Sequence, residues 1–452
     1  MATLLARNAT LIATMDDAGV EIRDAGIFVR DGVIEAVGPS ASLPQEADEI
    51  IDLAGHVVIP GLVNTHHHLY QNLTRAVPAA QDAALFGWLR TLYPIWARMT
   101  PEHIRISTLV GLAELAVSGC TTSSDHLYLF PNGIRLDDEI AAAGEIGMRF
   151  HATRGAMSIG ESAGGLPPDA LVEREDAILA DCRRVIETHH DAKRCAMTRV
   201  GVAPCSPFSV SQGLMRDAAV LARSHGVRLH THLAENAEDV AYSQAKFGMR
   251  PGAYAEALGW TGPDVWHAHC VCLDHSEIEL FARTGTGVAH CPSSNMRLAS
   301  GIAPVRRMLD AGMKIGLGVD GSASNDAAHM LSEARQAMLL QRVLGSGASM
   351  SAREALLLAT RGGAAVLGRD DIGVLAPGMA ADFAAFDLSA MELAGSGWDP
   401  LASLVFCAPL AANYTVVQGR CVVRQGRIAT VDMVPVLARH RRLVTGLMRG
   451  EA

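Results

Sequence analysis

The sequence predicts a (β/α)₈ TIM-type barrel with a small β-sandwich domain built from both termini, and three observations lead to this fold class. The middle of the chain alternates eight times between apolar and amphipathic segments, over roughly 300 residues. Most amphipathic segments end at a glycine, as helices often do. Both ends of the chain carry hairpin patterns instead. A doubly wound open sheet would alternate too, but no G-x-G-x-x-G pattern opens the first unit.

The predicted small domain combines residues 1–59 with residues 368–452, which include a C-terminal helix. Near the N-terminus, "GIFVRDGVIEAVG" predicts a hairpin because an Asp-Gly pair separates two apolar runs. Near the other end, "VVQGRCVVRQGRIATV" repeats this pattern with turns at Gly419 and Gly426, and "LAPGMAADFAAFDL" adds a turn and a strand. We expect the two ends of the chain to form one β domain.

The predicted barrel spans residues 60–367. Its expected strands are Val57–Asn64, Thr121–His126, Arg149–Arg154, Arg199–Ala203, Val227–His232, Val265–His269, Gly287–His290 and Lys314–Asp320. Helical patterns such as "HIRISTLVGLAELAVSG" and "SQGLMRDAAVLARSHG" lie between most of them. In such barrels the functional residues lie at the C-terminal ends of the strands.

Composition excludes several classes of protein. The chain has 452 residues, of which 49% are hydrophobic and 19% are charged, as expected of a globular enzyme. Its net charge is −10 and no basic cluster stands out, which argues against nucleic acid as a partner. No apolar run approaches the ~20 residues of a membrane span, and the apolar core of the N-terminus is too short for a signal peptide. The chain has nine scattered cysteines, which indicate reduced thiols, so we expect a cytoplasmic protein. We also expect the protein to form a homo-oligomer.

The stretch "PGLVNTHHHLYQ" places three histidines directly after an apolar strand. Alternate residues of a strand share a face, so His66 and His68 converge while His67 points away. Two convergent imidazoles indicate a metal site. The alternative is a polar loop whose histidines contact only water.

Three more strands end in residues of the same kind. The fifth strand ends in "LHTHLAE", where His232 and Glu235 can face one cavity. His230 shares the strand face with His232, but we favour His232 because it lies nearest the loop and precedes the glutamate. The sixth strand ends at His269, and the eighth ends at Asp320 in "GLGVDGSASND". Each residue alone is more often structural, but the repetition at successive strand ends indicates a site.

A set of three imidazoles and one carboxylate is suited to bind a divalent metal ion of intermediate softness. We expect this ion to be Zn²⁺, with Fe²⁺ as the alternative. Such an ion would lower the pKa of a bound water towards ~7. A second ion usually needs a bridging ligand, often a carboxylated lysine from the fourth strand. The chain has only three lysines, and none lies in "GVAPCSP" at the end of that strand. We therefore expect one divalent metal per chain.

The motifs "PGLVNTHHHL", "HLAE", "AHCV", "SSNMRLASG" and "GVDGSASND" resemble the amidohydrolase superfamily, in its mononuclear deaminase and chlorohydrolase branch. The resemblance covers nearly the whole chain. It implies that the metal ligands are His66, His68, His232 and Asp320. It further implies that Glu235 is a proton shuttle, that His269 orients and polarises the metal-bound water, and that Asp320 accepts a proton from that water. The reaction would be hydrolytic deamination of a cyclic amidine.

Two residues differ from those of related deaminases, and these differences narrow the range of expected substrates. Deaminases of adenosine and S-adenosylhomocysteine carry a glutamate in a "P-I-E" context that binds the ribose hydroxyls, and "P-H-S-P" after the fourth strand. Here "LYPIWARMTPE" has Trp96 and "APCSPF" has Cys205 at these positions. An indole cannot accept hydrogen bonds from ribose hydroxyls, which favours a free base or a similar small heterocycle. The alternative is that Trp96 only packs in the core.

The combination of "HHHLYQNLTRA", "SSDHLYLFP" and "APCSPF" is most similar to the 8-oxoguanine deaminase group, which implies conversion of 8-oxoguanine to urate and ammonia and activity on isocytosine. Beside Trp96 and Cys205, we expect Gln71, Tyr128 and Arg154 to line the pocket. Triazine hydrolases share the "HHHLYQ" pattern and are the main alternative, followed by guanine deaminase. A non-catalytic metal-binding protein is disfavoured, because metal storage needs no glutamate three residues after a ligand.

Overall fold

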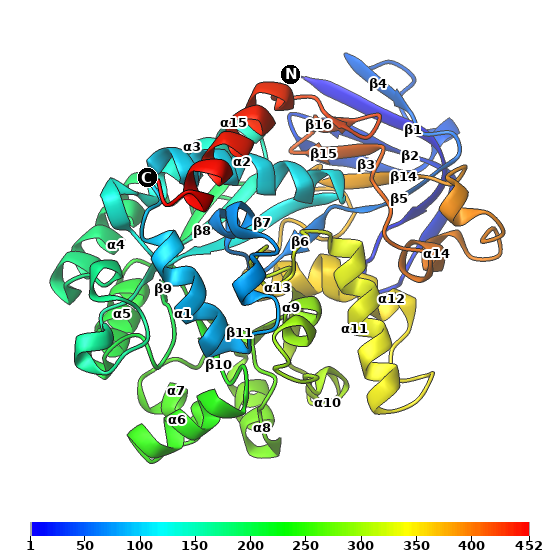
Figure 1. Ribbon diagram of the computed structural model, residues 1–452. Helices are drawn as coiled ribbons and strands as arrows, with labels where there is room; N and C mark the ends of the chain where they lie inside the picture. Colours follow the sequence, from blue (N-terminus) through cyan, green and yellow to red (C-terminus); the bar gives the residue numbers. More distant parts are fainter. Residues whose placement is uncertain (1, 452) are drawn as a thin grey trace.

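The computed structural model describes residues 2–451, and its centre is a closed barrel of parallel strands in the order β10-β11-β12-β13-β6-β7-β8-β9 (Figure 1). These strands are β6 (Leu62–Asn64), β7 (Cys120–Leu127), β8 (Arg149–Ala156), β9 (Thr198–Pro204), β10 (Arg228–Leu233), β11 (Val265–His269), β12 (Gly287–His290) and β13 (Lys314–Leu317). Helices surround this barrel, which confirms the predicted (β/α)₈ fold.

The helices follow the strands along the chain. They are α1 (Leu85–Trp96), α2 (Pro101–Val117), α3 (Leu136–Ile146), α4 (Glu175–His189), α5 (Gln212–Ser224), α6 (Ala237–Phe247), α7 (Pro251–Ala257), α8 (His275–Thr284), α9 (Pro292–Arg297), α10 (Val305–Asp310), α11 (Met330–Leu344), α12 (Ala352–Leu357), α13 (Gly363–Val366), α14 (Pro400–Phe406) and α15 (Met433–Met448). A single π-helical turn (Leu358–Gly362) joins α12 to α13. Every helix within residues 2–451 is too short or too polar to cross a bilayer.

The strand predicted over Val57–Asn64 is divided between two sheets, which corrects the sequence-based prediction. Strand β5 (His56–Pro60) belongs to the small sheet, and β6 begins the barrel after Gly61. A Cβ atom on Gly61 would clash with the side chain of Thr121, so the glycine lets the chain pass close to β7 as it changes sheets. The last predicted barrel strand is also shorter than expected, since β13 ends at Leu317.

Both ends of the chain form one connected, 9-stranded sheet, shown beside the barrel in Figure 1. Its members are β1 (Thr3–Ala13), β2 (Glu21–Arg30), β3 (Val33–Pro39), β4 (Glu49–Asp52), β5, β14 (Phe383–Asp387), β15 (Tyr414–Val417), β16 (Arg420–Arg424) and β17 (Arg427–Ile428). Strand β5 connects the two halves, because it pairs with β1 on one side and with β14 on the other. The predicted hairpins are present as β2–β3 and β15–β16.

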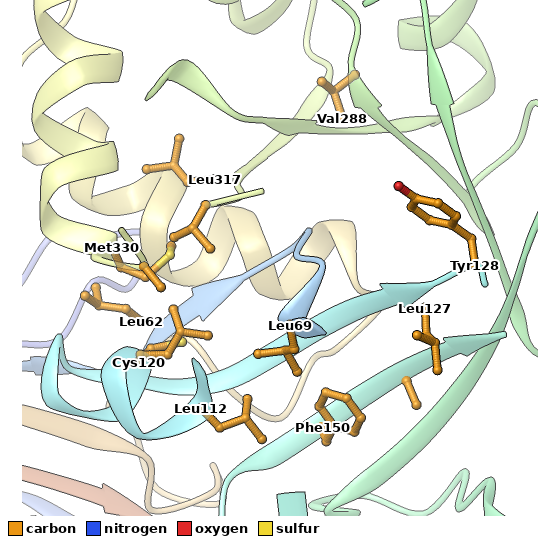
Figure 2. Packing of buried hydrophobic residues seen from close by; sticks show 14 of the residues in the cluster. Leu62, Leu69, Leu112, Cys120, Leu127, Tyr128, Phe150, Val288, Leu317 and Met330 are labelled. Carbon is orange, nitrogen blue, oxygen red and sulfur yellow. The ribbon is translucent and has the colours of Figure 1, made fainter. Parts of the chain in front are cut away.

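The main core lies between the barrel strands and the surrounding helices. Figure 2 shows Leu112 of α2 near Phe150 of β8, with Leu127 of β7 beside them; each of the three is at most 2% exposed. Truncating one such side chain to alanine would cost about 2–5 kcal/mol. This packing fixes the barrel strands, and therefore fixes the positions of the side chains at their C-terminal ends.

Candidate active site

A small cavity of about 40 Å³ lies at the C-terminal ends of the barrel strands. Its walls come from α1, from the loops after β6, β7, β9, β10, β12 and β13, and from the end of β11. The lining residues are His68, Gln71, Leu85, Trp88, Leu89, Tyr93, Tyr128, Cys205, Phe208, His232, Glu235, His269, Leu298, Asp320 and Ser324. The strand ends that carry polar residues in the sequence therefore meet at one place. His67 is buried outside this lining, and its Nδ1 accepts the backbone N–H of His68.

Backbone carbonyls hold His68 and His232 in a single tautomer. The Nδ1–H of His68 donates to the carbonyl of His126 at 2.7 Å, and the Nδ1–H of His232 donates to the carbonyl of Cys205 at 2.6 Å. A carbonyl oxygen only accepts, so each Nδ1 carries a proton. Burial lowers the pKa of His68, and it lowers the pKa of His232 to about 3, so both rings are neutral at pH 7. Each Nε2 therefore presents a lone pair.

His66 is held in the same tautomer by His230. The Nδ1–H of His230 donates to the carbonyl of Trp266 at 3.0 Å, which leaves the Nε2 of His230 as an acceptor. That nitrogen lies 2.8 Å from the Nδ1 of His66, which must then be the donor. Burial lowers the pKa of both rings well below the usual histidine value. His230 thus orients His66 from behind, whereas His232 faces the cavity.

The Nε2 atoms of His66 and His68 face the carboxylate of Asp320, and the Nε2 of His232 lies beside that of His68. The Nε2 atoms of His68 and His232 are 3.1 Å apart, and those of His66 and His68 lie 3.2 and 3.3 Å from Asp320 Oδ1. Donors at the ~2.0–2.1 Å typical of tetrahedral zinc would be about 3.4 Å apart, which is close to these spacings. Without a cation, these electron-rich atoms would repel one another in a buried site. The donor set therefore fits a divalent metal ion.

Hydroxyl groups hold the second oxygen of Asp320. The Ser294 hydroxyl donates to Asp320 Oδ2 at 2.6 Å, and the Ser324 hydroxyl lies 3.2 Å from the same atom. The backbone N–H of Gly321 donates to Oδ1 at 2.7 Å. Asp320 itself has a φ of 60°, in the left-handed region that costs a non-glycine residue about 1–3 kcal/mol. The fold therefore maintains a strained residue to keep this carboxylate in place.

Glu235 and His269 lie beside this cluster. Glu235 Oε2 is 3.6 Å from His269 Nε2, and the Ser300 hydroxyl is 3.5 Å from Glu235 Oε1. Burial raises the pKa of Glu235 to about 7, although His269 opposes this shift. The His269 Nδ1–H donates to Asn295 Oδ1 at 3.0 Å, which directs its Nε2 towards the carboxyl groups. Burial disfavours the protonated ring, but Glu235 and Asp320 outweigh it and raise the pKa of His269.

Three of the predicted substrate-contact residues line the cavity, namely Gln71, Tyr128 and Cys205. Gln71 is 1% exposed, and its Oε1 has no hydrogen-bond partner within residues 2–451. Gly321 lies directly against this amide, and a Cβ atom there would clash with it. An unpaired acceptor in a small cavity is suited to bind an N–H group of a ligand.

Trp96 and Arg154 do not line the cavity, which corrects the prediction for both residues. Trp96 is completely buried, and its indole N–H donates to Thr74 Oγ1 at 3.1 Å. Arg154 points towards α4 and forms ion pairs of 2.8 Å with Glu173 and Asp181. Its strand is buried on both faces, so the sequence pattern does not reveal which residues point into the barrel.

An aromatic wall that was not predicted from the sequence lines part of the cavity. Trp88 and Tyr93 of α1 line it together with Leu85 and Leu89, and Phe208 lies after β9. The four α1 residues have spacings of three, four and eight residues from Leu85, which place them on one helix face. This periodicity was a usable signal. Ser294, Asn295 and Ser300 lie in the motif "SSNMRLASG", and the sequence alone does not predict their contacts with Asp320, His269 and Glu235.

A comparison with protein-family models matches residues 57–422 to the amidohydrolase family. Among curated proteins, an 8-oxoguanine deaminase of Pseudomonas aeruginosa is 47% identical over 428 residues, covering 94% of this chain and 95% of that protein. A hydroxydechloroatrazine ethylaminohydrolase of Pseudomonas sp. (strain ADP) is 38% identical, covering 96% of this chain and 93% of that protein.

Solved structures show the same architecture. An atrazine chlorohydrolase from Arthrobacter aurescens TC1, complexed with zinc, superimposes with a TM-score of 0.93 at 34% identity. The match covers 98% of this chain and 100% of that chain. The similarity therefore includes both the barrel and the sheet formed by the two ends.

Proposed function

The chain belongs to the amidohydrolase family, and from that premise we propose that it is a metal-dependent hydrolytic deaminase of a free nucleobase, with 8-oxoguanine as its main substrate. One observation carries the proposal. The carboxyl group of Glu235 and the unpaired Oε1 of Gln71 share one small aromatic cavity with the convergent histidine nitrogens. Such a cavity combines an acid–base group, a contact for a ring N–H and a set of metal ligands.

We propose one divalent ion per chain, Zn²⁺, held by His66, His68, His232 and Asp320. The three Nε2 lone pairs and the carboxylate support this assignment, and the related chlorohydrolase was crystallised with zinc. When bound, such an ion acidifies a water molecule and so makes a nucleophile available at neutral pH.

The protein's own side chains would move the protons. Asp320 accepts a proton from the attacking water, while Ser294 keeps its carboxylate oriented. Glu235 delivers a proton to the ring nitrogen beside the attacked carbon, which makes that carbon more electrophilic. His269 lies 3.6 Å from Glu235 and 3.9 Å from Asp320, so it can hold the water and stabilise the negative charge that develops on its oxygen. Asp320 then passes its proton to the amino group, and Glu235 takes the hydroxyl proton of the tetrahedral centre. The C–N bond breaks, ammonia leaves and the carbonyl forms, with both carboxyl groups returned to their starting states.

The cavity supports a free base rather than a nucleoside. Trp88, Tyr93 and Phe208 offer flat apolar surfaces to a heterocycle, and leucines form part of the remaining wall, so the lining suits a planar ring better than the hydroxyl groups of a sugar. Gln71 Oε1 would accept an N–H of the purine edge. The 47% identity to an 8-oxoguanine deaminase supports the same substrate. Isocytosine presents the same amidine–carbonyl edge on a single ring and is expected to be a second substrate.

A triazine substrate is the second candidate. The relative from Pseudomonas sp. is an ethylaminohydrolase of a hydroxylated triazine, and Leu85, Leu89 and Leu298 provide apolar contacts for an alkyl group. The same metal and carboxyl groups would then displace an alkylamine instead of ammonia.

The test measures product release from a panel of substrates by the metal-loaded protein. The panel contains 8-oxoguanine, isocytosine, guanine, guanosine, adenosine and an N-alkylamino-hydroxytriazine. We expect the highest kcat/KM for 8-oxoguanine, with urate and ammonia formed in equal amounts. A higher kcat/KM for guanine or for the triazine would replace the proposed substrate. Efficient turnover of guanosine or adenosine would contradict the free-base assignment.

Gln71→Ala tests the proposed contact with the base. Loss of one hydrogen-bond partner in a buried site costs about 1–3 kcal/mol, so kcat/KM for 8-oxoguanine should fall by roughly 5–150-fold. Gln244→Ala, on the exposed face of α6, is the matched control and should leave kcat/KM unchanged. Equal values for the two variants would remove Gln71 from the substrate contacts.

A further inference from the structure

A second cavity lies at the opposite pole of the barrel, where the strands begin. It has a volume of about 390 Å³, and its lining includes His151, Arg199 and Arg228. These residues stand near the N-terminal ends of three adjacent strands, β8, β9 and β10 (Figure 1). In register, His151 is paired with Arg199, and Arg228 is paired with Gly201 of β9. The cavity is therefore separate from the candidate active site.

Arg228 uses little of its hydrogen-bonding capacity. Its Nη2 donates to the carbonyl of Val366 at 2.8 Å, whereas its buried Nε has no partner within residues 2–451. Gly368 makes room for this guanidinium, because a Cβ atom there would clash with it. Burial lowers the pKa of Arg228 to about 10, so the group is still charged at neutral pH.

Arg199 and His151 are also incompletely bonded. Arg199 Nη1 donates to the carbonyl of Gly368 at 3.1 Å, and its buried Nε has no partner among the described residues. His151 is 3% exposed, and neither of its ring nitrogens has a hydrogen-bond partner in residues 2–451. A neutral imidazole has one donor and one acceptor, so a fully buried ring with neither in use is unusual.

Neighbouring arginines do have carboxylate partners. Arg369 pairs with Asp371 at 2.7 Å, and Arg223, which lines the same cavity, pairs with Asp264 at 2.8 Å. Within residues 2–451, neither Arg199 nor Arg228 forms an ion pair. The carbonyl of Val366, the last residue of α13, accepts one N–H of Arg228, and that of Gly368, just after the helix, accepts one N–H of Arg199. Asp264, the carboxylate in the cavity lining, is occupied by Arg223, so the other two guanidinium groups of the lining are not paired with a carboxylate among the described residues.

We propose that this cavity binds a phosphoryl dianion, as the headgroup of a small phosphate monoester. Two guanidinium groups match its double negative charge, and their planar donor pairs suit phosphate oxygens. The ring N–H of His151 adds a neutral donor. The cavity is larger than a phosphate group needs, so a monoester such as a nucleoside monophosphate fits it better than free phosphate.

The test is isothermal titration calorimetry of the metal-loaded protein with inorganic phosphate and with adenosine monophosphate, at constant ionic strength. We expect one site per chain. Arg199→Met and Arg228→Met should each weaken binding by roughly 10–100-fold, since a hydrogen bond to a charged group contributes about 1.5–3 kcal/mol. Arg183→Met, an exposed arginine of α4, is the matched control and should bind normally.

Additional measurements distinguish this cavity from the metal centre and identify its ligand. Binding should persist in His68→Ala, and deaminase turnover should persist in Arg199→Met and Arg228→Met, which also shows that both variants fold. If adenosine monophosphate binds at least tenfold more tightly than inorganic phosphate, the ligand is a phosphate monoester. If the two affinities are equal, the cavity is still a phosphoryl site, and its ligand is free phosphate. Binding lost in His68→Ala but kept in Arg228→Met would overturn the proposal, as would the absence of binding by both ligands.

Discussion

The two poles of the barrel break the rule that buried polar groups are paired, and they do so in opposite ways. At the C-terminal pole, neutral histidines present lone pairs beside the carboxylate of Asp320, so the donor set of His66, His68, His232 and Asp320 is rich in electrons and contains no cation. At the N-terminal pole, Arg199 and Arg228 form no ion pair within residues 2–451. Asp264, the carboxylate in the cavity lining, is already paired with Arg223, so this cavity has an excess of positive charge. The sign of the missing charge indicates the sign of the ligand at each pole.

A buried arginine between the barrel and the small sheet shows how a purely structural cation differs. Arg149 of β8 is fully buried and forms an ion pair of 2.9 Å with Asp382, which precedes β14. Its remaining N–H groups donate to the carbonyls of Cys195 and Ala196 and to the side chain of Gln418. Each donor group of this guanidinium therefore has a protein partner, and no ligand is implied.

His68→Ala should have the largest effect, because it removes one of the convergent lone pairs at the electron-rich pole. We expect metal content to fall well below one equivalent and turnover to fall to background. His275→Ala, an exposed histidine of α8, is the control and should retain both. Elemental analysis and ammonia release measure the two effects. One full equivalent of metal in His68→Ala would mean that other residues form the site.

Arg149→Met should have the next largest effect, because it leaves Asp382 as an unpaired buried charge. Breaking a buried ion pair costs about 3–5 kcal/mol, read as a lower free energy of unfolding in urea. Arg30→Met breaks an exposed pair with Glu35 and should cost about 0–1 kcal/mol. Arg228→Met leaves no carboxylate unpaired and should cost less than Arg149→Met. Equal losses for Arg149→Met and Arg228→Met would break the distinction between a structural and a ligand-binding arginine.

Asn295→Ala tests a positioning residue of the active site. Without the Asn295 oxygen, the His269 ring loses the partner that directs its Nε2, and we expect kcat to fall by roughly 10–100-fold with little change in KM. Asn295→Asp keeps an acceptor oxygen and should restore most of the activity. Equal activity of the alanine and aspartate variants would show that this hydrogen bond does not orient His269.

Trp96→Phe should have the smallest effect. The indole N–H donates to Thr74 behind the cavity wall, so its loss should cost about 1 kcal/mol of stability. The ratio of kcat/KM for 8-oxoguanine to that for guanosine should not change, since Trp96 does not line the cavity. A change in this ratio would show that Trp96 does contact the substrate.

The sequence could predict that His66, His68 and His232 lie close together, because their positions depend on local spacing at strand ends, and this cluster is the proposed metal site. The substrate wall depends on how α1 docks, and there the prediction chose Trp96 instead of Trp88 and Tyr93. Arg154 illustrates another limit, since a strand buried on both faces gives no alternation that separates inward from outward residues. The N-terminal cavity was not predicted at all, because the absence of an ion-pair partner for Arg228 among the described residues is a property of the tertiary structure.

The central claim is that Glu235 transfers protons beside a metal held by other residues. The most direct test compares Glu235→Gln with Glu238→Gln, an exposed glutamate three residues further along the chain. Glutamine keeps the shape but cannot deliver a proton, so kcat for 8-oxoguanine should fall by about 10²–10⁴-fold while one metal equivalent is retained. Glu238→Gln should match the unmodified protein in both respects. Turnover by Glu235→Gln within a few-fold of the unmodified protein, with the metal in place, would contradict the account.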